Sequence, residues 1–171
     1  MLTIIEEIYT VKDYEKWEGD WELIEGRPYA MAPVPFNKHQ WMSGKILSLL
    51  NNKLKKCKKC FALMEAEYRV NNKTVLRPDV SLICGELGKY ITKAPLIIFE
   101  VISLSTRFRD EITKKEIYKQ QKVPFYVMIY PDNKIIMLDL KNEKEIEKIK
   151  INSPCGEIEI DKNEILEEIT L

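Results

Sequence analysis

The sequence predicts an α/β protein in which a central mixed β-sheet is flanked by helices. The order of predicted elements between residues 37 and 140 supports this class: a helix, three strands, a second helix and two more strands. The segment 95–102 supports it as well, because it is almost wholly apolar, as is typical of a strand covered on both faces. A chain of 171 residues with 45% hydrophobic residues fits one core, so we expect a single domain over residues 1–171.

The N-terminal region is predicted to hold a short helix and a hairpin. Residues 1–20 read as a peripheral arm, in which Thr10 caps a short helix. Two short strands at 21–25 and 29–32 follow. The Gly-Arg-Pro sequence between them is typical of a turn, so we expect these strands to pair.

A long helix is predicted to begin at Asn37 and to run for about five turns. Apolar residues recur along it at spacings of three and four, which places them on one face: Ile46, Leu47, Leu50 and Leu54. It ends in the segment 53–59, where five of seven residues are lysine. Lysines near a helix C-terminus suit the helix dipole, and a nucleic-acid contact is the alternative for this cluster.

Three strands are predicted next, at 61–70, 79–84 and 95–102, with residues 74–76 leading into the second. Residues 106–121 then read as a helix. The helix lies between two strands of the same predicted sheet, so it should cover one of the sheet's faces.

The last elements are two strands at 124–130 and 134–140, followed by a charged region. This region should contain one or two strands and a short acidic helix near 161–169. No internal repeat interrupts this order.

Charge and hydropathy exclude several classes of protein. Twenty-seven Lys and Arg balance 27 Asp and Glu, so binding of polyanions by bulk charge, as in histones, is not expected. Global disorder is excluded because hydrophobicity is ordinary and net charge is zero. No apolar segment reaches the ~18 residues of a membrane helix, and the N-terminus lacks the basic region of a signal peptide. We therefore expect a cytoplasmic protein with no membrane partner.

The four cysteines are expected to be thiols rather than a disulfide framework, because the protein is expected in the cytoplasm. Cys57 and Cys60 form one C-x-x-C pair, which is half of a zinc site. Cys84 and Cys155 lie far away in the sequence, and a redox motif would need a strand-to-helix setting. Metal binding or redox use of this pair is therefore the minor alternative.

Two carboxylates interrupt apolar strands. Glu100 lies within the most apolar segment, where a lone ionised carboxylate costs several kcal/mol unless it is paired, protonated or bound to a metal. Asp79 begins another apolar strand directly after Pro78, where a turn or strand-edge role is the simpler interpretation. Taken together, two carboxylates near the ends of consecutive strands can converge on one point. Carboxylate oxygens are ligands for hard cations such as Mg²⁺.

The predicted helix at 106–121 leaves the position of Lys114 open. Asp110, Lys114 and Tyr118 are spaced at i, i+4 and i+8, so they share one face. If Tyr118 packs on the sheet, Lys114 is turned inward as well. If Phe108 and Ile112 pack there instead, Lys114 is a solvated lysine paired with Asp110, which is the interpretation that periodicity alone favours.

The only histidine, His39, lies in the first turn of the long helix, from which it can reach a site or remain solvated. Glu22 and Glu25 flank the predicted hairpin. Glutamates of edge strands are usually solvated, so the residues alone give these two no role.

An ordered set of motifs between residues 21 and 140 resembles the Uma-type family of restriction-endonuclease-like proteins, within the PD-(D/E)xK nuclease superfamily. The resemblance rests on the following residues: Trp21-Glu22-Leu23-Ile24-Glu25-Gly26, Ala32-Pro33, His39-Gln40, Arg77-Pro78-Asp79-Val80, Phe99-Glu100-Val101-Ile102-Ser103, Asp110, Lys114, Tyr118, Val123-Pro124-Phe125-Tyr126 and Tyr130-Pro131. It implies the restriction-endonuclease-like fold, with the family core at 21–140 between the N-terminal arm and a C-terminal extension at 141–171.

The resemblance also implies a metal centre. Asp79 corresponds to the motif Asp and Glu100 to the second acidic residue, and both would bind Mg²⁺ or Mn²⁺ with the Val101 carbonyl as a third ligand. The superfamily places a Lys two residues after this Glu, but position 102 is Ile here. Lys114 is the matching position on the following helix, which favours the inward orientation of its side chain.

The implied reaction is metal-dependent hydrolysis of phosphodiester bonds in DNA. Lys114 would orient the attacking water or neutralise the scissile phosphate. The supporting residues would be Glu25, His39, Ser103, Asp110 and Tyr118. A homodimer is expected for a small nuclease that cuts two strands. The alternative is a catalytically silent domain of the same fold that binds nucleic acid or a partner protein.

Overall fold

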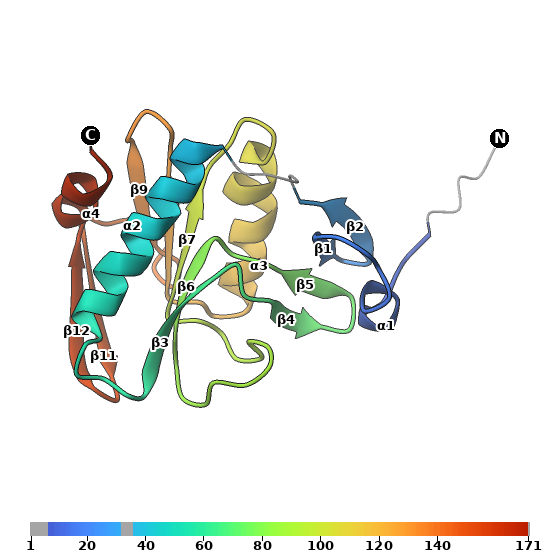
Figure 1. The fold of residues 1–171 in the computed structure, drawn as a ribbon, viewed down its shortest axis with the longest axis horizontal. Helices are drawn as coiled ribbons and strands as arrows, with labels where there is room; N and C mark the ends of the chain where they lie inside the picture. Colours follow the sequence, from blue (N-terminus) through green and yellow to red (C-terminus); the bar gives the residue numbers. More distant parts are fainter. Residues whose placement is uncertain (1–6, 32–35, 171) are drawn as a thin grey trace.

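The computed structural model describes residues 7–31 and 36–170. Residues 32 and 33 of the expected motif set lie outside them. Two sheets and a separate hairpin make up the strand structure (Figure 1). The larger sheet has six strands in the order β10-β9-β8-β7-β6-β3, with these bounds: β3 Cys60–Met64, β6 Val80–Cys84, β7 Ile97–Val101, β8 Phe125–Ile129, β9 Ile135–Asp139 and β10 Lys144–Glu145. Strands β7 and β8 are parallel and the other neighbours are antiparallel, so the predicted mixed sheet is present.

Strand β7 lies inside the sheet and is buried along its whole length. Its side chains alternate between the two faces, as the strand period requires. Ile97, Phe99 and Val101 pack into the core under the long helix, whereas Ile98 packs into the core on the opposite face. The alternation places Glu100 on the same face as Ile98.

One face of the large sheet is covered by α2 (Asn37–Lys53) and by the C-terminal region (Figure 1). That region consists of the hairpin β11 (Lys148–Ser153) and β12 (Gly156–Asp161), followed by α4 (Lys162–Ile169). Asp161 caps α4 by accepting a hydrogen bond from the Asn163 N–H. Buried isoleucines of the hairpin and α4 belong to the same core cluster as the inner side chains of α2, so the C-terminal extension forms part of the main core.

The opposite face carries the predicted second helix. It begins as a π-helical segment, η1 (Arg109–Lys114), and continues as α3 (Lys115–Gln120). Ile117 and Tyr118 pack on the sheet, whereas Phe108 and Ile112 are exposed. The helix therefore uses the orientation that turns Lys114 inward, and the solvated-lysine interpretation is wrong.

A four-stranded sheet lies beside this face, in the order β2-β1-β5-β4. Its bounds are β1 Trp21–Ile24, β2 Arg27–Ala30, β4 Tyr68–Asn71 and β5 Thr74–Leu76. The predicted hairpin is present, and its two turn residues, Glu25 and Gly26, both have positive φ (50° and 82°). A Cβ at Gly26 would clash with the Ile8 side chain and lie 3.1 Å from the Tyr9 carbonyl oxygen, so glycine is favoured there. The short helix α1 (Val11–Tyr14) packs on this sheet behind its Thr10 N-cap.

Three expectations need correction. Residues 74–76 do not lead into the strand at 79–84, because they form β5 of the small sheet, whereas β6 belongs to the large sheet. The predicted strand at 61–70 is divided between β3 and β4 of different sheets, because Glu65 has a positive φ (48°) that breaks the extended backbone. The cysteines are not free thiols, since Cys57 bonds to Cys155 and Cys60 bonds to Cys84. The long sequence separations hid these pairings.

None of the helices within the described residues is long and apolar enough to cross a membrane.

Candidate active site

Asp79 and Glu100 are brought together by the pairing of β6 with β7. Val80 lies opposite Phe99 in the antiparallel register, so Asp79 reaches the level of Glu100. The Asp79 N–H donates to Glu100 Oε2 (3.3 Å), and the Val101 N–H donates to Asp79 Oδ2 (2.7 Å). Both carboxylates are buried. The convergence expected from the sequence is therefore present in the structure.

The ammonium of Lys114 lies among three carboxylates. Its Nζ is 2.9 Å from Glu22 Oε1, 3.0 Å from Glu100 Oε1 and 3.3 Å from Asp110 Oδ1. Burial alone would lower the pKa of Lys114, but Glu100, Glu22 and Asp110 hold this pKa well above its usual value. The lysine is thus a fixed positive charge rather than a base.

Burial is the main reason why the pKa of Glu100 is raised well above its usual value. The charges of Asp79, Asp110 and Glu22 raise it further, and Lys114 opposes the rise. The Tyr118 hydroxyl donates to Glu100 Oε1 (2.9 Å), so this oxygen has two donors. Tyr118 thereby fixes the glutamate from the same helix that supplies Lys114.

Asp110 and Ser103 lie at the start of this helix. Burial raises the pKa of Asp110, while Lys114 and a hydrogen bond from Thr106 oppose the rise. Ser103 Oγ lies 2.9 Å from Thr106 Oγ1. Among the described residues, Ser103 is thus linked to Asp110 through Thr106.

His39 reaches the site from the first turn of α2. Its Nε2 lies 3.2 Å from Asp79 Oδ2. Burial would lower the pKa of His39, but its contact with Asp79 and the charges of Glu65 and Asp110 raise it. The imidazole is thus held against the carboxylate of Asp79, which directly precedes β6.

Glu25 is not part of this cluster. It lies in the β1–β2 turn with its side chain exposed, and its N–H donates to Thr74 Oγ1 (3.1 Å). Glu22 occupies the place in the cluster that was expected for Glu25. It lies within β1, and its side chain points inward with 2% exposure. Its Oε1 also accepts the Arg77 N–H (2.9 Å). In the sequence, the signal that points to Glu22 is an acidic residue between apolar neighbours in a short predicted strand.

Arg109 is a second residue of the cluster that was not predicted from the sequence. Its Nη1 lies 3.6 Å from Glu22 Oε2, and its guanidinium lies over the Tyr29 ring at 4.4 Å from the ring centre. Arg109 therefore joins η1 to the hairpin on the outer side of the cluster.

The residues of the cluster fit a divalent metal. Lys114 and Arg109 face four carboxylates, so negative charge is in excess: Glu22, Asp79, Glu100 and Asp110. Asp110 Oδ1 is buried without a hydrogen bond within the described residues, and its charge is compensated there by the Lys114 ammonium at 3.3 Å. Asp79 and Glu100 are the pair that can hold the metal, since Mg²⁺ needs only one or two protein carboxylates beside water and phosphate.

Comparison with known proteins identifies the family and the fold. The family named Uma2 and described as "Putative restriction endonuclease" matches residues 11–165. A solved structure from Anabaena variabilis ATCC 29413, described as "a putative nuclease belonging to DUF820", superposes with a TM-score of 0.73 at 16% identity, over 94% of this chain and 99% of that chain. A search of curated proteins found no match. The restriction-endonuclease-like fold is thereby confirmed, and because the family match spans most of the sequence, this chain belongs to the Uma2 restriction-endonuclease family.

Proposed function

We propose that this protein is an endonuclease that hydrolyses phosphodiester bonds of DNA and depends on Mg²⁺ or Mn²⁺. The observation that supports this most is the convergence of Asp79, Glu100 and Lys114 from a strand start, a buried strand and a helix. Carboxylates can hold a divalent metal, and a fixed cation can stabilise the negative charge that develops on a phosphate. The family match supports a nuclease. The dependence on a divalent metal and the choice of DNA as substrate are parts of our proposal.

Asp79 and Glu100 would hold the metal, with the Val101 carbonyl as a third ligand. A bound divalent metal lowers the pKa of a coordinated water and stabilises charge on the phosphate. The Val101 N–H and His39 both approach Asp79 Oδ2, so these contacts orient the carboxylate and leave Oδ1 for the metal. Tyr118 performs the same orienting role for Glu100.

Lys114 would neutralise the scissile phosphate and orient the attacking water. Its pKa is held high by three carboxylates, so it does not serve as the general base. Glu22 and Asp110 hold the ammonium beside Glu100, and Ser103 supports the start of the helix through Thr106. These are positioning residues, and Glu25 has no role in this scheme.

A homodimer is part of the proposal, because two copies of one site can cut both strands of a duplex. Light scattering of the purified protein with a short duplex tests this: a mass of one chain per duplex would contradict it.

Cleavage of DNA by the purified full-length protein tests the proposal. Linear and supercoiled duplex, single-stranded DNA and RNA are incubated with Mg²⁺, with Mn²⁺, or with a chelator. We expect DNA cleavage that requires the metal and that the Glu100→Gln variant lacks. Glu157→Gln serves as the matched control, because Glu157 is exposed on β12 in the C-terminal hairpin. Binding of DNA without cleavage under every metal condition would favour the silent domain instead.

A further inference from the structure

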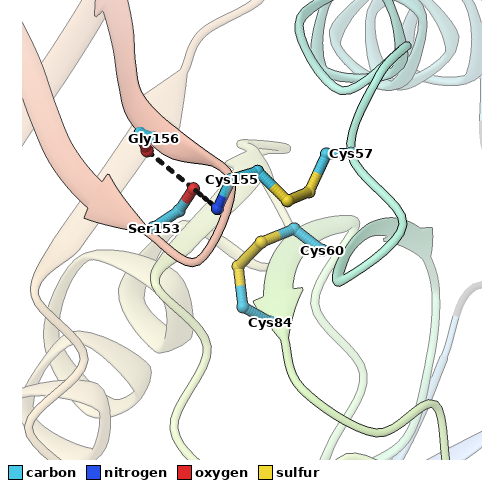
Figure 2. The surroundings of a disulfide bond; sticks show 6 residues. All are labelled: Cys57, Cys60, Cys84, Ser153, Cys155 and Gly156. Atoms are coloured by element: carbon cyan, nitrogen blue, oxygen red, sulfur yellow. Dashed lines mark hydrogen bonds between the residues drawn. A yellow bond between two sulfur atoms is a disulfide. The ribbon is translucent and has the colours of Figure 1, made fainter.

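The four cysteines come from distant parts of the chain and meet in one cluster (Figure 2). Cys57 follows the C-terminus of α2, Cys60 begins β3, Cys84 ends β6 and Cys155 lies in the β11–β12 turn. The turn is ordered, because Ser153 Oγ accepts the Cys155 N–H (3.1 Å) and donates to the Gly156 carbonyl (2.7 Å). We propose that, when its two disulfides are reduced, this cluster binds one Zn²⁺ through four thiolates.

The donor set fits zinc. The sulfur atoms of Cys57, Cys60 and Cys155 all lie within 4.8 Å of one another, and Cys84 is bonded to Cys60. Zn–S bonds of about 2.3 Å in a tetrahedron place sulfurs roughly 3.8 Å apart, which is within the range of the three mutually close sulfurs. The Cys84 thiol would complete the set by rotating toward them once its bond to Cys60 is reduced. The C-x-x-C pair supplies half of the site, and the fold supplies the other half. Four sulfur ligands favour zinc over the hard cations that suit carboxylates.

The charges around the cluster also fit. Four thiolates and one Zn²⁺ carry a net charge of two minus, whereas two disulfides are neutral. Within the part of the chain that the structure describes, no ion-pair partner is found for four exposed lysines beside the cluster: Lys55, Lys56, Lys58 and Lys59. The helix dipole does not account for Lys58 and Lys59, because α2 ends at Lys53 and the dipole acts within the last turn.

The reaction balances with a dithiol or with a phosphine and water. A phosphine takes up the oxygen of one water per disulfide to become a phosphine oxide, and that water supplies the two protons of the thiols. Each disulfide takes up two electrons and two protons, and a dithiol that supplies them becomes a disulfide itself. The four thiols then release four protons as Zn²⁺ binds. The state of the cluster thus depends on the reducing strength of its surroundings and on zinc.

The site would be structural and separate from the carboxylates. Asp79 directly precedes β6 and Cys84 is its last residue, so the two centres lie at opposite ends of one strand, about 16 Å apart. The zinc would tie the C-terminal hairpin to α2 and to the strand pair β3–β6.

Cobalt titration of the full-length protein tests the proposal. The protein is reduced with a phosphine, so that no dithiol reductant competes with the cysteine thiolates for the metal. Excess Mg²⁺ is added to occupy the proposed carboxylate site. We expect one Co²⁺ per chain, with thiolate-to-cobalt charge-transfer bands in the near ultraviolet that Zn²⁺ abolishes. The Cys84→Ser and Cys155→Ser variants should each lower zinc affinity by at least the roughly 10- to 100-fold that loss of an outer-shell partner costs. The Glu100→Gln variant should titrate like wild type.

If a reduced protein unfolds, circular dichroism and cysteine alkylation test the proposal instead. Zn²⁺ should then restore the native spectrum and protect all four cysteines from alkylation. Absence of the charge-transfer bands in the folded reduced protein would overturn the proposal. Zinc that neither refolds the protein nor protects its cysteines, or a Cys155→Ser spectrum equal to that of wild type, would overturn it too.

Discussion

Lys114 Nζ lies 2.9 Å from Glu22 Oε1, so an ion pair joins the helix on the large sheet to the first strand of the small sheet. Both side chains are almost fully buried. The same Glu22 oxygen accepts the Arg77 N–H, two residues before Asp79. The N-terminal hairpin is thus connected to the helix that carries Lys114 and to the segment that carries a proposed metal ligand.

Replacing Glu22 by glutamine should weaken this connection. We expect Glu22→Gln to lower the free energy of unfolding by about 1–3 kcal/mol, since a buried charge-assisted contact is lost. Glu25→Gln is the matched control, because Glu25 is exposed three residues away, and exposed substitutions usually change stability by less than about 0.5 kcal/mol. Urea unfolding of both variants measures the difference, and equal losses would contradict the role of Glu22.

The sequence predicted the parts of the site that local patterns encode. Glu100 was predictable because a carboxylate within a buried strand needs a compensating partner. Asp79 was predictable only in combination with Glu100, as a second carboxylate at the start of another apolar strand. Glu22 was not, because its burial depends on how the small sheet lies against η1. Glu25 was predicted from the same segment but lies exposed in the turn, since no local rule tells which glutamate of a hairpin points inward.

The Lys114→Ala variant should be strongly destabilised near neutral pH. Removing the ammonium leaves Glu22, Glu100 and Asp110 close together in a buried site, and loss of one partner from such a group costs about 3–5 kcal/mol. Lys115→Ala is the control on the adjacent, half-buried position. Urea unfolding near neutral pH measures both, and a similar small loss for the two would contradict the buried role of Lys114.

The same variant should recover stability as pH falls. The pKa values of Glu100 and Asp110 are raised in the folded protein, and without Lys114 they should rise further. The folded variant then binds more protons than the unfolded chain, so its stability falls as pH rises through this range and returns as pH falls. Unfolding at about pH 5 and about pH 8 checks the sign relative to wild type. A deficit that grows toward acid pH would oppose the prediction.

Two buried tyrosines provide a matched comparison. Tyr118 donates to the Glu100 carboxylate (2.9 Å), whereas Tyr126 donates to the Asp110 backbone carbonyl (3.0 Å). We expect Tyr118→Phe to cost about 1.5–3 kcal/mol of stability and Tyr126→Phe about 0.5–1.5 kcal/mol, because bonds to charged groups are stronger. Only Tyr118→Phe should also weaken Mn²⁺ binding. Calorimetry that shows equal weakening in both variants would count against Tyr118 as a positioning residue.

The disulfides should stabilise the oxidised protein unequally. Cys57 and Cys155 are 98 residues apart, whereas Cys60 and Cys84 are 24 apart. Chain entropy predicts about 4.7 kcal/mol for a loop near 100 residues and about 3 kcal/mol for one near 15. The Cys57→Ser/Cys155→Ser variant should therefore lose more stability than Cys60→Ser/Cys84→Ser. Urea unfolding with a chelator and no reductant measures this, and the reverse order would refute the entropic account.

Residues that meet only through the fold could not be paired from patterns in the sequence. The C-x-x-C pair was visible, but its partners Cys84 and Cys155 come from a strand end and a turn that only the fold brings near. The π-helical start of the second helix was equally invisible, because the periodicity of residues 106–121 was compatible with two faces. Buried contacts at Tyr118 select one face and thereby place Lys114.

Glu100→Gln should remove metal binding while it preserves the fold. Glutamine is nearly isosteric and can still accept the Tyr118 hydroxyl, but it lacks the charge that a divalent metal requires. Calorimetric titration of Mn²⁺ into the oxidised protein, in which all four cysteines are in disulfides, should give binding for wild type and Glu157→Gln and none for Glu100→Gln. Unchanged affinity in Glu100→Gln would remove this residue from the metal site. Binding lost in the Glu157→Gln control as well would show that the loss is not specific to Glu100 and would contradict the prediction.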